Sequence, residues 1–316
     1  MATTPPQTHK AVATPATRAK LILLDRATEP PEQGEILVRV AWASSTPLNL
    51  HQADGGLLVT HPYILSSDYG GEVVAVGGAD DNDPELHGIK VGDTVFGFAW
   101  RKDRERTHQE YVTVPAFLAS RLPPNLTLQE AVTVPTNLVT AFHVLTKDLQ
   151  LELPWPLPDG WTPPSADAPV LIWGAAGSVG TYCVQVLRHW RYRHILAVAS
   201  GRHHAYLKEA GATACFDYGD PDVTARILEH VGPAPDGTGP RVPFVVDAIG
   251  SLDGTLAPLT RVAERGTRVA VMLPSSCAMP PRMSSPSTRW TWARPIRVGG
   301  PRGPSCSAPG RTFTWT

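Results

Sequence analysis

Residues Val170-Leu-Ile-Trp173, followed by Gly174-Ala-Ala-Gly177-Ser178-Val179-Gly180, decide the expected fold of this chain. The four apolar residues predict a buried strand, the glycines predict a tight turn, and the spacing from Ser178 to Trp190 predicts a helix. Such a turn lets the backbone approach a pyrophosphate, to which the helix offers free N–H groups. We therefore predict a dinucleotide site here, with a turn that binds no ligand as the alternative. The residues expected to contact the cofactor are Gly174, Ala176, Gly177, Ser178, Val179 and Gly180.

Apolar segments and helical segments alternate after this turn. Further strands are predicted at residues 195–199, 214–216, 244–247 and 267–273, with helices at about 203–210, 222–231 and 252–265. Fully apolar strands that alternate with helices are typical of a parallel sheet covered on both faces. The fold class is therefore α/β, with a doubly wound nucleotide-binding sheet.

The end of the second strand of this sheet indicates which dinucleotide binds. An acidic residue there would bind the ribose 2′-hydroxyl of NAD. This chain has Ser200-Gly-Arg202-His203-His204 instead, with no carboxylate before Glu209. An arginine can pair with a 2′-phosphate and a serine can donate to it. The sequence favours NADP(H), with a solvated Arg202 as the alternative.

The first 125 residues have a different pattern. Short strands are predicted at 35–43, 72–76, 91–96 and 110–114, separated by glycine-containing turns, which is typical of a small curved β domain. A capping-box pattern at Thr127–Glu130 predicts a helix to about Lys147, and the proline-rich stretch 151–169 predicts a linker. We divide the chain into a substrate and catalytic domain (1–125), a cofactor domain (126–279) and an atypical tail (280–316).

Charge and composition separate the tail from the rest of the chain. The 316 residues carry a formal net charge of −1, but residues 280–316 contain seven Pro, six Arg and no Asp, Glu or Lys. The near-neutral total argues against a nucleic-acid partner. The polar start of the chain and the lack of a long apolar stretch predict a cytoplasmic protein without a membrane segment.

In order along the chain, the segments resemble the zinc-free branch of the medium-chain dehydrogenase/reductase superfamily. That branch includes quinone oxidoreductases and fungal trans-acting enoyl reductases. Residues 31–40, 67–77 and 91–97 are similar to its GroES-like domain, and residues 123–141 to its connecting helix. The glycine turn, Gly211-Ala212 and Phe216-Asp-Tyr218 are similar to its cofactor domain.

The resemblance implies further site residues. It places Tyr218 against the 2′-phosphate of NADP(H), and it places Pro47, Asn49, Thr140 and Ile249 beside the nicotinamide half. It implies catalytic roles for Thr46 and Asn49, which replace the Asn and Asp of the family's Asn-Pro-x-Asp segment. Tyr69 is the candidate proton donor, with a packing role or protonation by solvent as alternatives.

The resemblance also implies that no metal is bound. Zinc-dependent members carry a Cys near Ser45–Thr46 and a His near Ser67-Asp68, and neither residue type is present at those positions. His51 and His108 are interpreted as surface or loop histidines.

The implied function is NADPH-dependent reduction of an activated C=C bond, in a trans-acting enoyl reductase of polyketide-type secondary metabolism. The alternatives are an NADPH quinone oxidoreductase and an inactive paralogue that only binds the cofactor. The expected partners are a small-molecule or carrier-bound acyl substrate and a polyketide synthase.

The resemblance ends near residue 275. The tail is expected to lack an apolar strand, so the sheet would lose its last strand, and the chain would be a monomer or an impaired dimer. An out-of-frame or mis-spliced continuation is the first hypothesis for its composition, and a genuine disordered tail is the second.

Overall fold

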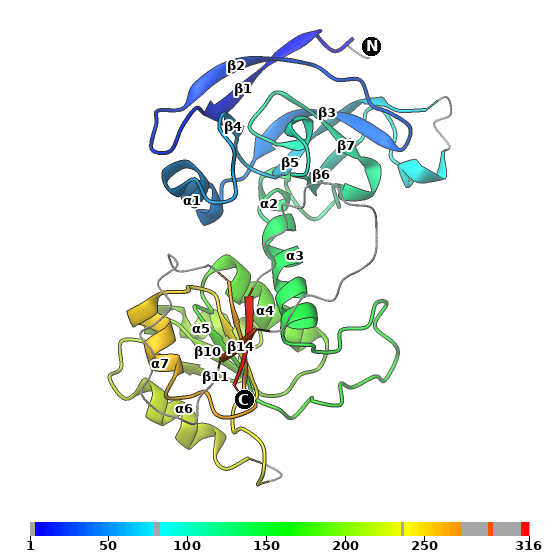
Figure 1. Cartoon of the computed structure of the whole chain (residues 1–316). Helices are drawn as coiled ribbons and strands as arrows, with labels where there is room; N and C mark the ends of the chain where they lie inside the picture. Colours follow the sequence, from blue (N-terminus) through cyan, green and yellow to red (C-terminus); the bar gives the residue numbers. More distant parts are fainter. Residues whose placement is uncertain (1–3, 79–82, 235–236, 273–289, 293–310, 316) are drawn as a thin grey trace. The chain divides into compact units, whose positions relative to one another are not determined.

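The computed structural model describes residues 4–78, 83–234, 237–272, 290–292 and 311–315 (Figure 1). The chain divides into two compact units, Met1–Thr136 and Asn137–Thr316, called unit 1 and unit 2. The sequence-based boundary at 125/126 precedes the connecting helix, whereas the observed boundary lies inside helix α3 (Pro135–His143). Within the described residues, no helix has the length and apolar character that crossing a bilayer requires.

Unit 2 is built on a sheet whose central five strands are parallel. Their order is β11-β10-β9-β12-β13, so the two halves of the sheet run outward from β9 and β12. This is the doubly wound order predicted from the sequence. The strands are β9 (Val170–Trp173), β10 (Ile195–Val198), β11 (Ala214–Phe216), β12 (Phe244–Asp247) and β13 (Arg268–Val271).

Both faces of this sheet are buried, which explains why its strands are apolar except for Asp247 and Arg268 at strand ends. Val170 and Ile172 pack on the same side as helix α4 (Ser178–His189) and α5 (His204–Ala210), whereas Leu171 and Trp173 pack on the other. That second side is covered by α6 (Val223–Val231) and α7 (Ala257–Leu259). The helix predicted for 252–265 is shorter than expected, because a π-helical turn, η6 (Leu252–Leu256), precedes α7.

Two strands from the tail extend the sheet beyond β13. Strand β15 (Arg311–Trp315) pairs antiparallel with β13, and β14 (Trp290–Trp292) pairs antiparallel with β15. The expectation that the tail holds no strand and that the sheet lacks a last strand is therefore wrong for these segments. Threonine and aromatic residues alternate in Arg311-Thr-Phe-Thr-Trp315, a pattern that suits a strand despite the proline-rich context. The rest of 280–316 lies outside the described residues.

Unit 1 is a β domain, as predicted. An antiparallel sheet of order β7-β3-β5-β6-β8 lies beside a smaller sheet of order β2-β1-β4. The predicted strands are β3 (Glu35–Ala43), β5 (Asp68–Val76), β6 (Thr94–Phe98) and β7 (Tyr111–Pro115). The unpredicted ones are β1 (Thr8–Thr14), β2 (Ile22–Ala27), β4 (Tyr63–Ile64) and β8 (Ala119–Arg121), and the short helices are η1 (Pro84–Leu86), η2 (Asp103–Glu105) and η3 (Ala116–Leu118).

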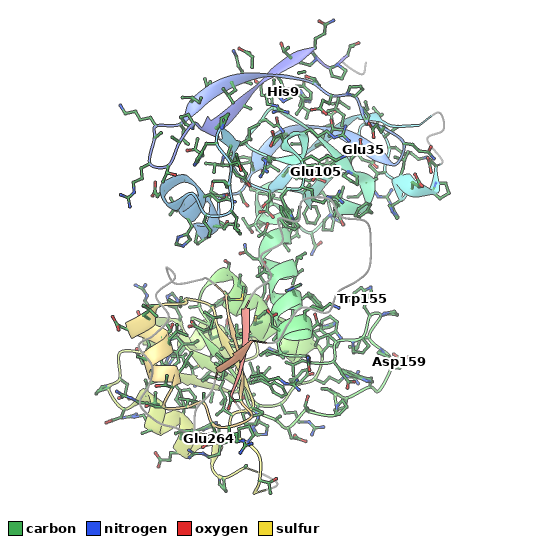
Figure 2. All side chains as sticks on the ribbon, in the orientation of Figure 1. His9, Glu35, Glu105, Trp155, Asp159 and Glu264 are labelled. Atoms are coloured by element: carbon green, nitrogen blue, oxygen red, sulfur yellow. The ribbon has the colours of Figure 1, made fainter. Side chains whose placement is uncertain are left out.

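Buried polar side chains link β1 and β3 to the segment 104–109. His9 Nε2 lies 3.1 Å from Gln109 Oε1, and Glu35 accepts from Arg104 Nη2 at 2.6 Å. Figure 2 shows His9, Glu35 and Glu105 within unit 1. Because Arg104 is nine-tenths buried, its pairing with Glu35 compensates a charge withdrawn from water.

The predicted helix from Thr127 to Lys147 is interrupted. The capping box forms, with Thr127 N donating to Glu130 Oε2 at 2.8 Å, but α2 (Leu128–Ala131) ends after one turn. Proline at 135 has no N–H and disfavours a helical residue before it, so α3 starts anew there. A π-helical turn, η4 (Val144–Asp148), follows α3.

The proline-rich stretch 151–169 contains no helix or strand, and it is fixed to unit 2 by its backbone. Trp190 Nε1 donates to Pro154 O at 3.0 Å, and the Tyr192 hydroxyl donates to Glu152 O at 3.2 Å. Trp155 is 80% exposed, and Figure 2 shows it together with Asp159 on this segment. The stretch is thus a surface loop, which is one of the roles that proline content favours.

Candidate functional site

The glycine turn lies between the end of β9 and the start of α4. Gly174 has a φ of +79°, and a Cβ atom there would lie 2.7 Å from Ile249 Cγ1. Gly177 N donates to Gly174 O at 3.0 Å and closes the turn. Because Gly177 caps α4 without a side chain, it leaves the first-turn N–H groups to other acceptors. This cradle fits the pyrophosphate of a dinucleotide.

The remaining residues predicted for the turn gather at the same end of the sheet. Gly180 is buried, and a Cβ atom there would lie 2.7 Å from Ala175 Cα, so only glycine lets α4 approach so closely. Ser178 is exposed and its Oγ donates to Asn137 Oδ1 at 3.0 Å. This bond sets the first turn of α4 beside α3, which also carries the half-buried Thr140. Ala176 and Val179 are half-buried within the turn.

The loop after β12 reaches the glycine turn from the neighbouring strand. Ile249 is 47% exposed and lies beside Gly174. Asp247 accepts hydrogen bonds from Ile249 N and Gly250 N, each at 3.0 Å, and from Thr255 Oγ1 at 2.6 Å. Burial raises the pKa of this fully buried carboxyl, and the three donors oppose that rise.

Asp247 therefore holds the loop at the point where the strand order reverses, which is where ligands bind in open α/β sheets. The sequence analysis did not single it out. The sequence feature that could have identified Asp247 is its position as the one acidic residue at the end of the apolar strand Phe244–Asp247.

The end of β10 carries the residues predicted to bind a 2′-phosphate. Ser200 precedes a single 3₁₀ turn, η5 (Gly201–His203), which leads into α5. Arg202 is exposed, its Nε donates to His203 Nε2 at 3.1 Å, and within the described residues its guanidinium forms no ion pair. Tyr218 follows β11 and is 59% exposed. A solvent-accessible guanidinium suits a phosphate ligand.

Asp217, which is not among the residues predicted for the phosphate, forms hydrogen bonds with Gly201 and Gly219, the sequence neighbours of Arg202 and Tyr218. Its Oδ2 accepts from Gly201 N and its Oδ1 from Gly219 N, both at 2.8 Å. These hydrogen bonds hold the pKa of the Asp217 carboxyl below its ordinary value. The prediction for the end of β11 was limited to Tyr218, whereas the bond between Asp217 and Gly201 depends on contact between adjacent parallel strands.

In unit 1, the segment predicted to lie near the nicotinamide starts helix α1 (Pro47–Gly55). Pro47 is its first residue, and the buried Asn49 accepts from Thr46 N at 2.8 Å. Asn49 Nδ2 also donates to Gln52 Oε1 at 3.1 Å, so both ends of its amide are engaged inside the helix. Thr46 is the N-cap residue of α1, and its hydroxyl can donate its proton to a further acceptor.

The positions where zinc-dependent members carry ligands hold a different arrangement. Asp68 is 1% exposed and accepts from Thr136 N at 2.8 Å, Thr136 Oγ1 at 2.6 Å and Ser44 Oγ at 3.1 Å. Burial raises its pKa, and its donors secure the start of α3 to β5. His51 is exposed, but His108 is half-buried with Nε2 3.4 Å from Ser45 Oγ, and burial lowers its pKa. Among the described residues, no three His, Cys, Asp or Glu side chains are grouped as a metal site.

Tyr69 does not occupy a position from which it could donate a proton to a substrate. It is fully buried in the core of unit 1, and its hydroxyl donates to Leu118 O at 3.2 Å. Burial raises its pKa far above the usual value. The prediction that Tyr69 is the catalytic acid is therefore wrong, and the alternative of a packing tyrosine describes it.

Comparisons with known proteins agree with this architecture. Residues 32–143 match the alcohol dehydrogenase GroES-like domain family. The chain is 32% identical to a dehydrogenase of Monascus ruber, over 70% of this chain and 60% of that protein. It is 29% identical to a trans-enoyl reductase of Aspergillus terreus, over 71% of this chain and 73% of that protein. A mycobacterial protein solved in complex with NADPH matches with a TM-score of 0.58 and 26% identity, covering 82% and 71% of the two chains.

These findings place the chain in the medium-chain dehydrogenase/reductase superfamily, as its motifs indicated. Unit 1 contains most of the matched GroES-like segment, and unit 2 contains a Rossmann-like parallel sheet. The chain spans only 60% of the length of the Monascus ruber relative.

Proposed function

We propose that this chain is an NADPH-dependent oxidoreductase that reduces an activated carbon–carbon double bond, as a trans-acting enoyl reductase of polyketide-type secondary metabolism. The glycine turn between β9 and α4 carries the proposal, because it leaves helix N–H groups and space for a pyrophosphate. The similarity to the trans-enoyl reductase of Aspergillus terreus supports the choice of reaction.

The residues that would hold NADPH form three groups. Gly174, Ala176, Gly177, Ser178, Val179 and Gly180 would bind the pyrophosphate, and Ser200, Arg202, His203 and Tyr218 would bind the 2′-phosphate. Thr140 and Ile249 are the candidates of unit 2 for the nicotinamide half, and Pro47 and Asn49 are the residues of unit 1 that the resemblance implies for it. The exposed guanidinium of Arg202, which has no ion pair among the described residues, is the feature that supports NADPH over NADH. When bound, the cofactor supplies the hydride that adds to the β-carbon of an enoyl thioester.

The protein's own contribution would be to stabilise negative charge on the substrate. As the double bond accepts the hydride, its electron pair moves to the thioester oxygen, and a donor near that oxygen lowers the barrier. Thr46 is the candidate donor because its hydroxyl carries a proton and lies at the start of α1. Asn49 is retained as a positioning residue, since its amide fixes the start of α1. With Tyr69 buried, the proton for the α-carbon would come from water.

The expected setting is a cytoplasmic enzyme that receives an acyl chain, free or carrier-bound, from a polyketide synthase. The test begins with binding, measured as the change in NADPH fluorescence on addition of the protein. NADPH oxidation is then compared between a crotonyl thioester and a quinone. We expect oxidation with the thioester only. Oxidation with the quinone alone would establish the quinone oxidoreductase instead, binding without turnover would establish an inactive paralogue, and absence of binding would refute all three.

A further inference from the structure

Asp217 joins two loops that come from neighbouring strands of the sheet. One loop follows β10 and contains Gly201, and the other follows β11 and contains Gly219. The carboxylate accepts from Gly201 N through Oδ2 and from Gly219 N through Oδ1, each at 2.8 Å. One side chain thus fixes the separation of two loops that are otherwise apart in sequence.

The two glycines are fitted closely to this carboxylate. A Cβ atom on Gly201 would lie 2.9 Å from Asp217 Oδ2, and one on Gly219 would lie 3.2 Å from Oδ1. A larger residue at either position would have to displace the carboxylate. The bridge therefore depends on three residues together, Gly201, Asp217 and Gly219.

The loops that Asp217 joins carry the proposed 2′-phosphate ligands. Arg202 follows Gly201 directly, and Tyr218 lies between Asp217 and Gly219. A carboxylate at this place has two opposite effects on a bound phosphate. Its charge repels the anion, but this repulsion is screened by solvent and offset by the two N–H groups. Its hydrogen bonds would hold the loops that carry Arg202 and Tyr218 in place. This lowers the conformational-entropy cost of ordering the two loops when the ligand binds.

We propose that Asp217 is a positioning residue that sets the preference of this site for a 2′-phosphorylated adenosine, by bridging the loops that carry Arg202 and Tyr218. This inference rests on the proposed use of NADPH. The Asp217 carboxylate is then necessary for recognition of the 2′-phosphate, although both groups are negatively charged.

The experiment measures the affinity of the full chain for 5′-AMP and for adenosine 2′,5′-bisphosphate, which differ only in the 2′-phosphate. The ratio of the two dissociation constants is determined for the wild type, Asp217→Ala, Asp217→Asn and Gly201→Ala. We expect Asp217→Ala and Gly201→Ala to lower the preference for the bisphosphate about tenfold, the usual effect of losing a hydrogen bond to a charged group. Asp217→Asn should lie in between, because an NH2 group replaces one of the two oxygens that accept from Gly201 N and Gly219 N.

The matched control is Asp220→Asn, which removes a carboxylate three residues along without touching the bridge. Asp220 pairs with Arg226 at 2.8 Å. The ratio of Asp220→Asn should stay at the wild-type value, and all variants should bind 5′-AMP as the wild type does. A ratio that is unchanged or higher in Asp217→Ala and Gly201→Ala would overturn the inference, since removal of charge alone favours the anion. A wild-type protein that binds both nucleotides equally would instead refute the proposed use of NADPH, and the inference with it.

Discussion

Arg202 is the side chain on which the choice between NADPH and NADH depends most directly. It is exposed, and within the described residues its guanidinium has no anionic partner to give up when a phosphate arrives. Replacement of Arg202 with Glu should weaken NADPH binding about a hundredfold, because it removes a charge-assisted hydrogen bond and adds a like charge. NADH binding should change little. Isothermal titration with both cofactors checks this, and an equal loss for both would show that Arg202 does not contact the 2′-phosphate.

Asp247 links stability to pH through its burial. Burial raises its pKa in the folded protein, so the folded state binds a proton more readily than the unfolded state does. Its contribution to stability is therefore full below the ordinary pKa of an aspartate and is lost as pH rises through the raised value. Asn at this position retains an acceptor but does not titrate.

The stability of the wild type relative to Asp247→Asn should therefore be greater at about pH 4 than at about pH 7. Urea unfolding of both proteins at the two pH values measures this difference. A wild-type advantage that increases with pH would contradict the assigned direction of the shift. Asp217→Asn makes a useful contrast, since hydrogen bonds from Gly219 N and Gly201 N lower the pKa of Asp217 and its contribution has the opposite pH dependence.

Among the elements, the β9 turn and α4 owe their close approach to Gly180. A Cβ atom there would lie 2.7 Å from Ala175 Cα, and backbone cannot shift as a side chain does. Gly180→Ala should destabilise the protein by about 2 kcal/mol, since overpacking exceeds the gain in helix propensity. It should also weaken NADPH binding by moving the first turn of α4.

Gly177→Ala is the control for this prediction. Its φ of −72° suits alanine, and the nearest atom to its Cβ would be Gly174 O at 3.3 Å. We expect a loss of about 0.7 kcal/mol, the difference between glycine and alanine at a helix N-cap. Thermal unfolding of both variants measures the difference, and equal destabilisation would mean that Gly180 is not specifically constrained.

The elements that the sequence predicted well are those whose pattern is local. The five parallel strands are apolar except for Asp247 and Arg268 at their ends because both faces are covered, and the capping box at Thr127 forms where expected. Interactions between distant residues were not predictable in the same way. The bond between Asp217 and Gly201 depends on adjacent strands ending at one edge, and the burial of Tyr69 depends on the closed core of unit 1.

At the scale of the whole molecule, the tail determines how the sheet of unit 2 ends. Strand β15 pairs with β13 from Val271↔Arg311 to Arg268↔Thr314, so it covers the main-chain groups along one side of the last parallel strand. An uncovered strand edge is a template for pairing with another chain. The tail, although its composition is basic and proline-rich, thus contributes the strand β15 to the sheet of unit 2.

Deletion of residues 311–316 should therefore promote self-association. The edge of β13 would lose β15 and, with it, β14, which pairs with β15 alone among the described strands. Sedimentation velocity over a concentration series should show the deleted form shifting to larger species at concentrations where the full chain does not. Substitution of Thr312 by Pro, which removes a main-chain donor from β15, should produce a weaker shift in the same direction. Identical sedimentation of all three proteins would mean that β15 does not protect the edge in solution.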